Sequence, residues 1–385
     1  MPRIKPEIET FARIKVVGVG GGGGNAVSRM FNAQIKGVDF IAINTDAQDL
    51  HNAKVSTKIH IGKNLTRGLG AGMNPDIGRQ AAEENRDEIA DALKGADLVF
   101  ITCGLGGGTG SGASPIVADA AHDVGALAIA VVTKPFSFEG KKRAAIAEEA
   151  LASLRDRVDT LITIPNDKVL SLIDKNTSII EAFNIIDDIL KQGVQGIADL
   201  ITYPGIVNVD FADIKVIMSS AGSALMGIGR AIGEDRAAVA AKAAINSPLL
   251  DISINGARGI LFNVSGGMDL GMNDINEAAK VIIESIDSEA KVIFGATHDS
   301  RLKKGEVKVT VVATGFNNNK YSESDNGSNV VTPRVLTPFV RSSEGGENFL
   351  PVKKPTVNVE IIDEEEWDMP AFLRRKKDKD TDDKK

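Results

Sequence analysis

The chain has 385 residues, enough for two domains or one large one, since a domain typically takes about 100–200 residues. Its net charge of −7 disfavours a general nucleic-acid-binding role, and its one cysteine, Cys103, excludes a disulfide framework and fits a reducing cytosol. No apolar run approaches the roughly 20 residues that span a bilayer, so we expect a cytoplasmic protein without its own membrane anchor.

After a flexible N-terminus (residues 1–12), short β-branched runs alternate with amphipathic segments. The apolar runs cover residues 14–19, 39–44, 97–103, 126–133 and 158–165. Such nearly uninterrupted runs are typical of strands buried on both faces of a parallel sheet. The segments between them, such as 75–95 and 137–157, have helical character. The alternation predicts a Rossmann-like, doubly wound α/β domain over residues 13–176.

Residues 177–203 follow a helical spacing and predict one long central helix. Asn176 or Thr177 would cap it, Pro204 would end it, and Gly193 and Gly196 would weaken it locally.

A smaller α+β domain is expected over residues 204–316, with three strands and two helices. The strands are predicted within 256–267, 290–299 and 306–316, and the helices near 236–246 and 273–286. Residues 317–358 are rich in Asn, Ser, Gly and Pro and predict a disordered linker.

The last segment, residues 359–385, places an apolar cluster between an acidic run and a basic one. The cluster consists of Trp367, Met369, Pro370, Phe372 and Leu373. On a flexible tether this pattern is typical of a partner-binding peptide, and the alternative is an inert solubilising tail.

Two glycine-rich segments carry the strongest chemical signal. Residues 18–23 satisfy the GxGxxG dinucleotide pattern after a strand, although a run of five glycines satisfies almost any glycine pattern. The pattern also requires an acidic residue about 20 positions later, at the end of the next strand. Asn44 and Asp46 stand there, so this requirement is met only in part. A nicotinamide-dependent oxidoreductase would explain this segment but leaves the second one, residues 103–115, without a purpose.

That second segment also follows a strand and opens a helix. Successive backbone N–H groups and helix N-termini bind anions, so two such segments suit a triphosphate held from two sides. The Gly-Lys-Ser/Thr ending of a P-loop is absent, so backbone dipoles, Mg²⁺ and an arginine would have to neutralise the phosphates. The alternative is that the glycines serve only tight turns.

Three further groups keep two interpretations each. Glu139 and Arg143 are four residues apart, a spacing that favours a surface ion pair over a role in the nucleotide site. Phe183 and Asp187 share one helix face: the ring could stack on a base and the carboxylate could accept two N–H bonds from guanine, or they are a core residue beside a solvated one.

The third group is Asn208, Asp210 and Asp213, in a loop that enters a helix. These acids are either helix caps or groups that polarise a water and hold a cation. We expect no zinc site, because the four histidines are scattered and have no ligand spacing to Cys103.

Several of these motifs together resemble one family. The sequence GGGTGSG at 106–112 resembles the signature of the tubulin superfamily of GTPases. With the segments 17–27, 40–50, 135–143 and 208–215, the chain resembles the family of the bacterial cell-division protein FtsZ over about residues 12–316. DMPAFLRR at 368–375 is similar to that family's C-terminal peptide, whereas Ser111 stands where many bacterial relatives carry threonine.

The resemblance implies a site for GTP or GDP with Mg²⁺, and it leaves room for K⁺. It assigns the phosphates to Gly21, Gly22, Gly23, Gly24, Asn25, Gly108, Thr109 and Gly110. It assigns the ribose and guanine to Glu139, Arg143, Asn166, Phe183 and Asp187. Asn208, Asp210 and Asp213 would reach the nucleotide of the next subunit and place the attacking water.

The resemblance also implies head-to-tail filaments that build the bacterial division ring at mid-cell. Membrane-anchoring adaptor proteins would bind the C-terminal peptide, so that the membrane is reached only indirectly, and no nucleic acid is expected. A scaffold that does not hydrolyse nucleotide is opposed by the presence of Asp210 and Asp213, and a eukaryotic-type tubulin by the length and the tail.

Overall fold

The computed structural model describes residues 12–170, 173, 177–202, 205, 207, 209–248, 250, 254, 256–299 and 301–316. The predicted linker and C-terminal peptide, with Trp367 and its neighbours, lie outside these residues, as do Asn208 and the expected helix-end residues Asn176 and Pro204. Within the described part, no helix combines the length and the apolar character needed to cross a membrane.

Ten strands form one sheet in the order β3-β2-β1-β4-β5-β6-β7-β10-β8-β9. The first six are β1 (Ile14–Val19), β2 (Val38–Asn44), β3 (Thr57–His60), β4 (Leu98–Gly104), β5 (Leu127–Lys134) and β6 (Thr160–Pro165). All neighbours among these six pair in parallel, which gives the 3-2-1-4-5-6 order of a Rossmann fold.

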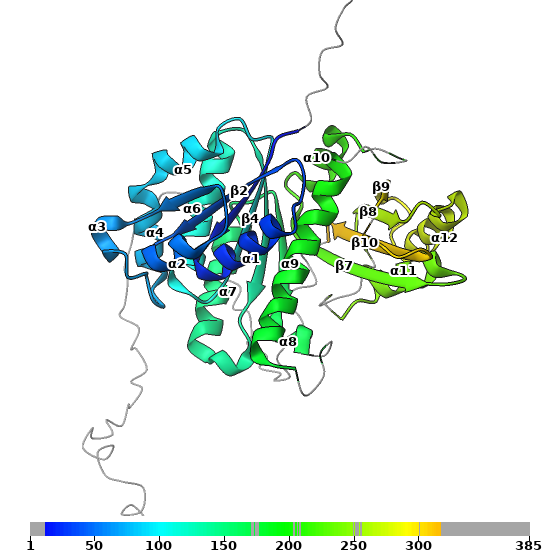
Figure 1. The fold of residues 1–385 in the computed structure, drawn as a ribbon. Helices are drawn as coiled ribbons and strands as arrows, with labels where there is room; N and C mark the ends of the chain where they lie inside the picture. Colours follow the sequence, from blue (N-terminus) through cyan, green and yellow to red (C-terminus); the bar gives the residue numbers. More distant parts are fainter. Residues whose placement is uncertain are drawn as a thin grey trace, which may run out of the picture. The chain divides into compact units, whose positions relative to one another are not determined.

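The connecting helices are α1 (Gly20–Asn32), α2 (Ala47–Asn52), α3 (Lys63–Thr66), α4 (Pro75–Glu84), α5 (Arg86–Leu93), α6 (Gly108–Asp123), α7 (Lys141–Arg155) and α8 (Asn166–Val169), with a 3₁₀ turn at Ser137–Glu139. They are followed by α9 (Ile179–Thr202) and α10 (Phe211–Met218). Figure 1 shows α9 between the two groups of strands.

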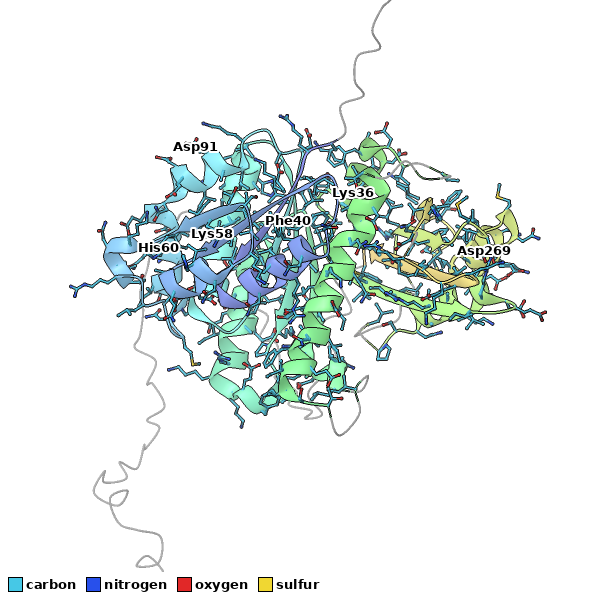
Figure 2. The ribbon with its side chains drawn as sticks, in the orientation of Figure 1. Lys36, Phe40, Lys58, His60, Asp91 and Asp269 are labelled. Atoms are coloured by element: carbon cyan, nitrogen blue, oxygen red, sulfur yellow. The ribbon has the colours of Figure 1, made fainter. Side chains whose placement is uncertain are left out.

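The parallel strands are covered on both faces. One core joins them to α1 and α9, and the other joins them to α4, α5, α6 and α7. Phe40 of β2, labelled in Figure 2, belongs to the first core. Its ring meets that of Phe31 edge-on at a centroid distance of 6.1 Å. Burial on both faces explains why these strands read as continuous apolar runs.

The C-terminal strands are β7 (Gly222–Ile232), β8 (Gly259–Gly266), β9 (Lys291–His298) and β10 (Glu306–Thr314). The N-terminal part of β7 pairs in parallel with β6, and β7 then pairs antiparallel with β10, so the sheet continues from one region into the other. Helices α11 (Arg236–Ile245) and α12 (Met272–Ile283) pack on β8 and β10 around a separate apolar core.

The predicted fold class is confirmed, with corrections to single elements. The strands β3 and β7 were not predicted, and the expected helix over 75–95 is two helices that meet at Asn85. The α9 cap is Ser178, whose Oγ accepts the Glu181 N–H at 3.2 Å, and not the predicted candidate Thr177. Ser178 directly precedes the first helical residue, where a side-chain acceptor reaches the free N–H groups.

Candidate functional site

A cavity of about 330 Å³ lies at the carboxyl ends of the parallel strands. Four residues at the ends of these strands line the cavity. They are Val19 of β1, Gly104 of β4, Thr133 of β5 and Asn166, which directly follows β6. Strands β1 and β4 are neighbours, but the helices that follow them cover opposite faces of the sheet. In α/β folds this switch point is where ligands bind.

Two helix N-termini meet at this cavity. Helix α1 begins at Gly20 directly after β1, and α6 begins at Gly108. Neither has a side-chain cap or an acidic residue in its first turn. Their positive dipole ends and free N–H groups therefore suit an anion.

The predicted phosphate residues divide between two places. Gly21 and Gly22 of α1 and Gly108, Thr109 and Gly110 of α6 line the cavity. The Gly108 N–H already donates to the Gly72 carbonyl at 2.7 Å, which ties α6 to the loop before α4. Among the other N–H groups of the two first turns, those of Gly21, Gly22, Thr109 and Gly110 are the donors that the cavity offers to a ligand.

Gly23, Gly24 and Asn25 do not line this cavity. A side chain at position 23 would place its Cβ 2.4 Å from the Thr102 carbonyl oxygen, so Gly23 allows α1 to lie directly against β4. Gly24 and Asn25 line a second, smaller cavity of about 40 Å³, which Asp49 also lines. Their predicted contact with phosphate remains a prediction.

Glu139 and Arg143 form the ion pair that their spacing predicts. The Arg143 guanidinium donates to the Glu139 carboxylate, which also accepts the Phe136 N–H at 2.9 Å. Both side chains line the cavity, so this ion pair is part of its wall.

A further part of the wall comes from the first turns of α9. The Phe183 ring, 43% exposed, meets Phe136 edge-on at 5.6 Å and presents free surface to the cavity. Asp187 lies one turn later and accepts from Arg29 Nε of α1 at 2.8 Å. Burial raises the pKa of Asp187 above its ordinary value, and the charge of Arg29 opposes that rise.

Asn166 completes the site with an unused acceptor. Its side chain is buried and lines the cavity, and its Oδ1 has no hydrogen-bond partner among the described residues. A buried acceptor without a donor is costly, so this oxygen is suited to a hydroxyl or N–H of a ligand.

Sequence reasoning missed the lining residues Gly72 and Thr133. It also missed Arg29, which is not part of the lining but donates to Asp187. Thr133 could have been found, since it stands near the carboxyl end of a predicted parallel strand. Arg29 could not, because its role depends on the packing of α1 against α9.

Asp210 and Asp213 lie outside the cavity, exposed at the start of α10. Asp210 caps this helix by accepting the Ala212 N–H at 3.0 Å. Within one chain, the structure therefore gives the capping role to Asp210 and brings neither acid to the two glycine-rich helix starts.

The comparisons with known proteins agree with this geometry. Residues 13–174 match the GTPase domain of the Tubulin/FtsZ family, and residues 222–317 match the C-terminal domain of the FtsZ family. A solved FtsZ dimer from M. jannaschii is 47% identical to the chain, with a TM-score of 0.77 over 80% of this chain and 89% of that one. The chain belongs to the FtsZ family. The predicted resemblance is confirmed, and so is the activity of the family, the hydrolysis of GTP.

More distant structures share the fold alone. CetZ1 from Haloferax volcanii, a GDP-bound monomer, is 22% identical with a TM-score of 0.70, over 80% of this chain and 95% of that one. CetZ2 from the same organism, a GTPγS-bound protofilament, is 21% identical with a TM-score of 0.68, over 80% of this chain and 94% of that one.

Proposed function

We propose that this FtsZ-family GTPase binds GTP in the cavity between α1, α6 and α9. The phosphates would lie at the two glycine-rich helix starts, where N–H groups of Gly21, Gly22, Thr109 and Gly110 are available. The observation that carries this proposal is the convergence of two uncapped helix N-termini on one cavity at the switch point of the sheet.

The base would lie against the α9 wall. Phe183 offers a ring face, and the Asp187 carboxylate can accept the N1 and N2 hydrogens of guanine, a donor pair that adenine lacks. Asn166 Oδ1 would accept from the ribose or the base, and the Glu139–Arg143 pair would border the nucleotide.

Hydrolysis would be completed by a second subunit. Asp210 and Asp213 are exposed, lie outside the cavity of their own chain, and sit at the start of α10. Asn208, two residues before Asp210 in the sequence, is proposed to act with them. Inserted over a neighbour's nucleotide, these carboxylates would orient the attacking water in line with the terminal phosphate. Because a head-to-tail contact of this kind does not close, it produces a filament.

Mg²⁺ would enter with the nucleotide. The described residues contain no cluster of three His, Cys, Asp or Glu side chains that could hold a metal. Mg²⁺ at nucleotide sites is held largely by substrate phosphates and water, so the phosphates would supply the oxygen ligands that the backbone N–H groups cannot. K⁺ is proposed as a further ion, to be tested by exchanging it for Na⁺.

At the cellular level we propose that the filaments form the bacterial division ring at mid-cell in the cytoplasm. Adaptor proteins would attach them to the membrane through the C-terminal peptide, by its apolar cluster of Trp367, Met369, Pro370, Phe372 and Leu373. Support for this part is the sequence pattern of the tail together with membership of the FtsZ family.

The first experiment measures phosphate release from GTP per subunit over a series of protein concentrations, with Mg²⁺ and either K⁺ or Na⁺. We expect a concentration below which turnover nearly vanishes, because each active site needs a neighbour. Constant turnover per subunit at high dilution would show that each monomer hydrolyses alone, and the roles of Asp210 and Asp213 would have to be withdrawn.

A substitution tests the same proposal at one residue. Asp213→Ala should bind GTP like the unmodified protein and hydrolyse it at least about 100-fold more slowly, a size typical of a lost proton-transfer group. Lys215 is exposed on the same helix, so Lys215→Ala is the matched control and should leave turnover nearly unchanged. Full turnover by Asp213→Ala would exclude the assigned role.

A further inference from the structure

Thr45 contacts the candidate phosphate site without lining it. It follows β2 directly, is fully buried, and places its Oγ1 2.6 Å from Oγ1 of Thr109. Thr109 is the second residue of α6 and lines the cavity, whereas Thr45 lies behind it. The two hydroxyl groups form one buried hydrogen bond between the end of β2 and the helix start.

The backbone of Thr45 is held from two sides. Its carbonyl accepts from Thr66 Oγ1 at 3.1 Å and from His60 Nε2 at 3.3 Å. His60 ends β3, as Figure 2 shows, and Thr66 ends α3. Thr45 is therefore held between three segments, and the partner of its hydroxyl among the described residues is Thr109.

The direction of the hydrogen bond follows from the ligand. A hydroxyl has one hydrogen to donate and two lone pairs that accept. Ionised phosphate oxygens only accept, so Thr109 can contact them with a hydrogen bond only by donating its single hydrogen. Thr109 must then accept from Thr45.

We propose that Thr45 is a positioning residue for GTP: it donates its hydroxyl hydrogen to Thr109 and thereby turns the Thr109 hydrogen towards the phosphates. This inference rests on the proposed binding of phosphate at the α6 helix start. In the absence of this donor, Thr109 can satisfy its buried oxygen only by rotating, and its hydrogen is no longer directed at the ligand.

Two substitutions separate donation from packing. Thr45→Val keeps the branched shape and removes the hydroxyl, so it should weaken binding of GDP and of a non-hydrolysable GTP analogue about five- to tenfold, the size of one lost hydrogen bond. Thr45→Ser keeps the donor and should stay within about twofold of the unmodified protein by the same reasoning.

A double-mutant cycle tests whether Thr45 acts through Thr109. Thr109→Val should weaken binding, and adding Thr45→Val to it should cause no further loss. The matched control is Thr160→Val: Thr160 is equally buried and donates to the Met218 carbonyl at 2.5 Å, outside the cavity. It should lower thermal stability to a similar extent as Thr45→Val and leave nucleotide affinity unchanged.

The measurements use the full chain freed of nucleotide, with thermal unfolding recorded for every variant. Equal affinities of Thr45→Val and the unmodified protein would overturn the inference and leave the proposed function intact. Equal losses in Thr45→Ser and Thr45→Val, or additive losses in the cycle, would also overturn it, since packing or an independent contact would then explain the effect. An unmodified protein that binds neither ligand would overturn the proposed function, and the inference with it.

Discussion

Among single residues, Asp187 is the one from which we expect base selectivity. Its carboxylate lines the cavity beside Phe183 and would accept two guanine N–H bonds. Asp187→Ala should therefore lose about 1–3 kcal/mol of preference for GTP over ATP, the value of one good bidentate contact to a base. Competition between the two nucleotides for the protein measures this preference directly.

The control for this prediction is the next residue along the chain. Asp188 is half exposed and pairs with Lys191, so Asp188→Ala removes the same charge from α9 without touching the cavity wall. It should leave the preference unchanged. An unaltered GTP-to-ATP ratio in Asp187→Ala would instead show that the base is read elsewhere.

The residues of this wall also show what sequence can foresee. Phe183 and Asp187 could be paired from their spacing, because residues four apart share a helix face. The choice between a base-binding pair and a core residue beside a solvated one needed tertiary structure. The Arg29 contact, the edge-on packing of Phe136 and the unused oxygen of Asn166 each depend on a segment far away in sequence.

At the level of elements, the contact between α4 and α6 fixes the second glycine-rich helix start. Gly112 of α6 lies so close to α4 that an added Cβ would be 1.9 Å from the Pro75 carbonyl oxygen. Gly112→Ala should therefore destabilise the fold by about 1–3 kcal/mol, as expected when extra volume enters a packed contact. Urea denaturation measures the change.

The same substitution in the other glycine-rich helix has the opposite expected sign. A Cβ at Gly24 of α1 would meet nothing within 4 Å, so Gly24→Ala should raise stability by about 0.5–1 kcal/mol through the entropy of the unfolded chain. A loss of stability from both substitutions would indicate a general intolerance of side chains in these helices and would contradict the packing argument.

Close packing explains why sequence analysis missed strand β7. Strand β7 carries Gly227 and Gly229, where a Cβ would lie 2.0 Å from carbonyl oxygens of α11, so close packing replaced the apolar residues that would have marked a strand. Similarly, Gly193 and Gly196 were expected to weaken α9. In the structure they let α9 approach Met226 of β7 and Thr310 of β10 within van der Waals contact.

At the scale of the whole molecule, the contact between α9 and the C-terminal strands contains two carboxylates, Asp199 and Asp299, whose charged and hydrogen-bonding neighbours differ. Asp199 of α9 is buried and accepts from Gln195 at 3.1 Å, while its other oxygen has no partner among the described residues. Asp299, after β9, lies 3.7 Å from the buried Lys308 ammonium and accepts three bonds from Arg301, two from the guanidinium and one from the backbone N–H.

The pKa values of the two carboxylates shift in opposite directions. Burial raises the pKa of Asp199 above 3.8, although the charge of Lys308 opposes the rise. Burial alone would also raise the pKa of Asp299, but the bonds from Arg301 and the charge of Lys308 lower it overall. Asp199 therefore contributes stability that is present below its unfolded pKa and is lost as pH rises through its folded pKa. The contribution of Asp299 is present above its unfolded pKa and is lost as pH falls through its folded pKa.

This difference predicts the pH dependence of two isosteric substitutions, measured as the free energy of unfolding in urea from below pH 3.8 to neutral pH. Asp199→Asn should gain stability relative to the unmodified protein as pH rises, because the variant has no buried carboxylate to ionise. Asp299→Asn should lose stability over the same interval, because Lys308 and Arg301 lose their ionised partner. Parallel pH profiles for the two variants would contradict this prediction and show that the charges of Asp199 and Asp299 do not govern the contact between α9 and the C-terminal strands.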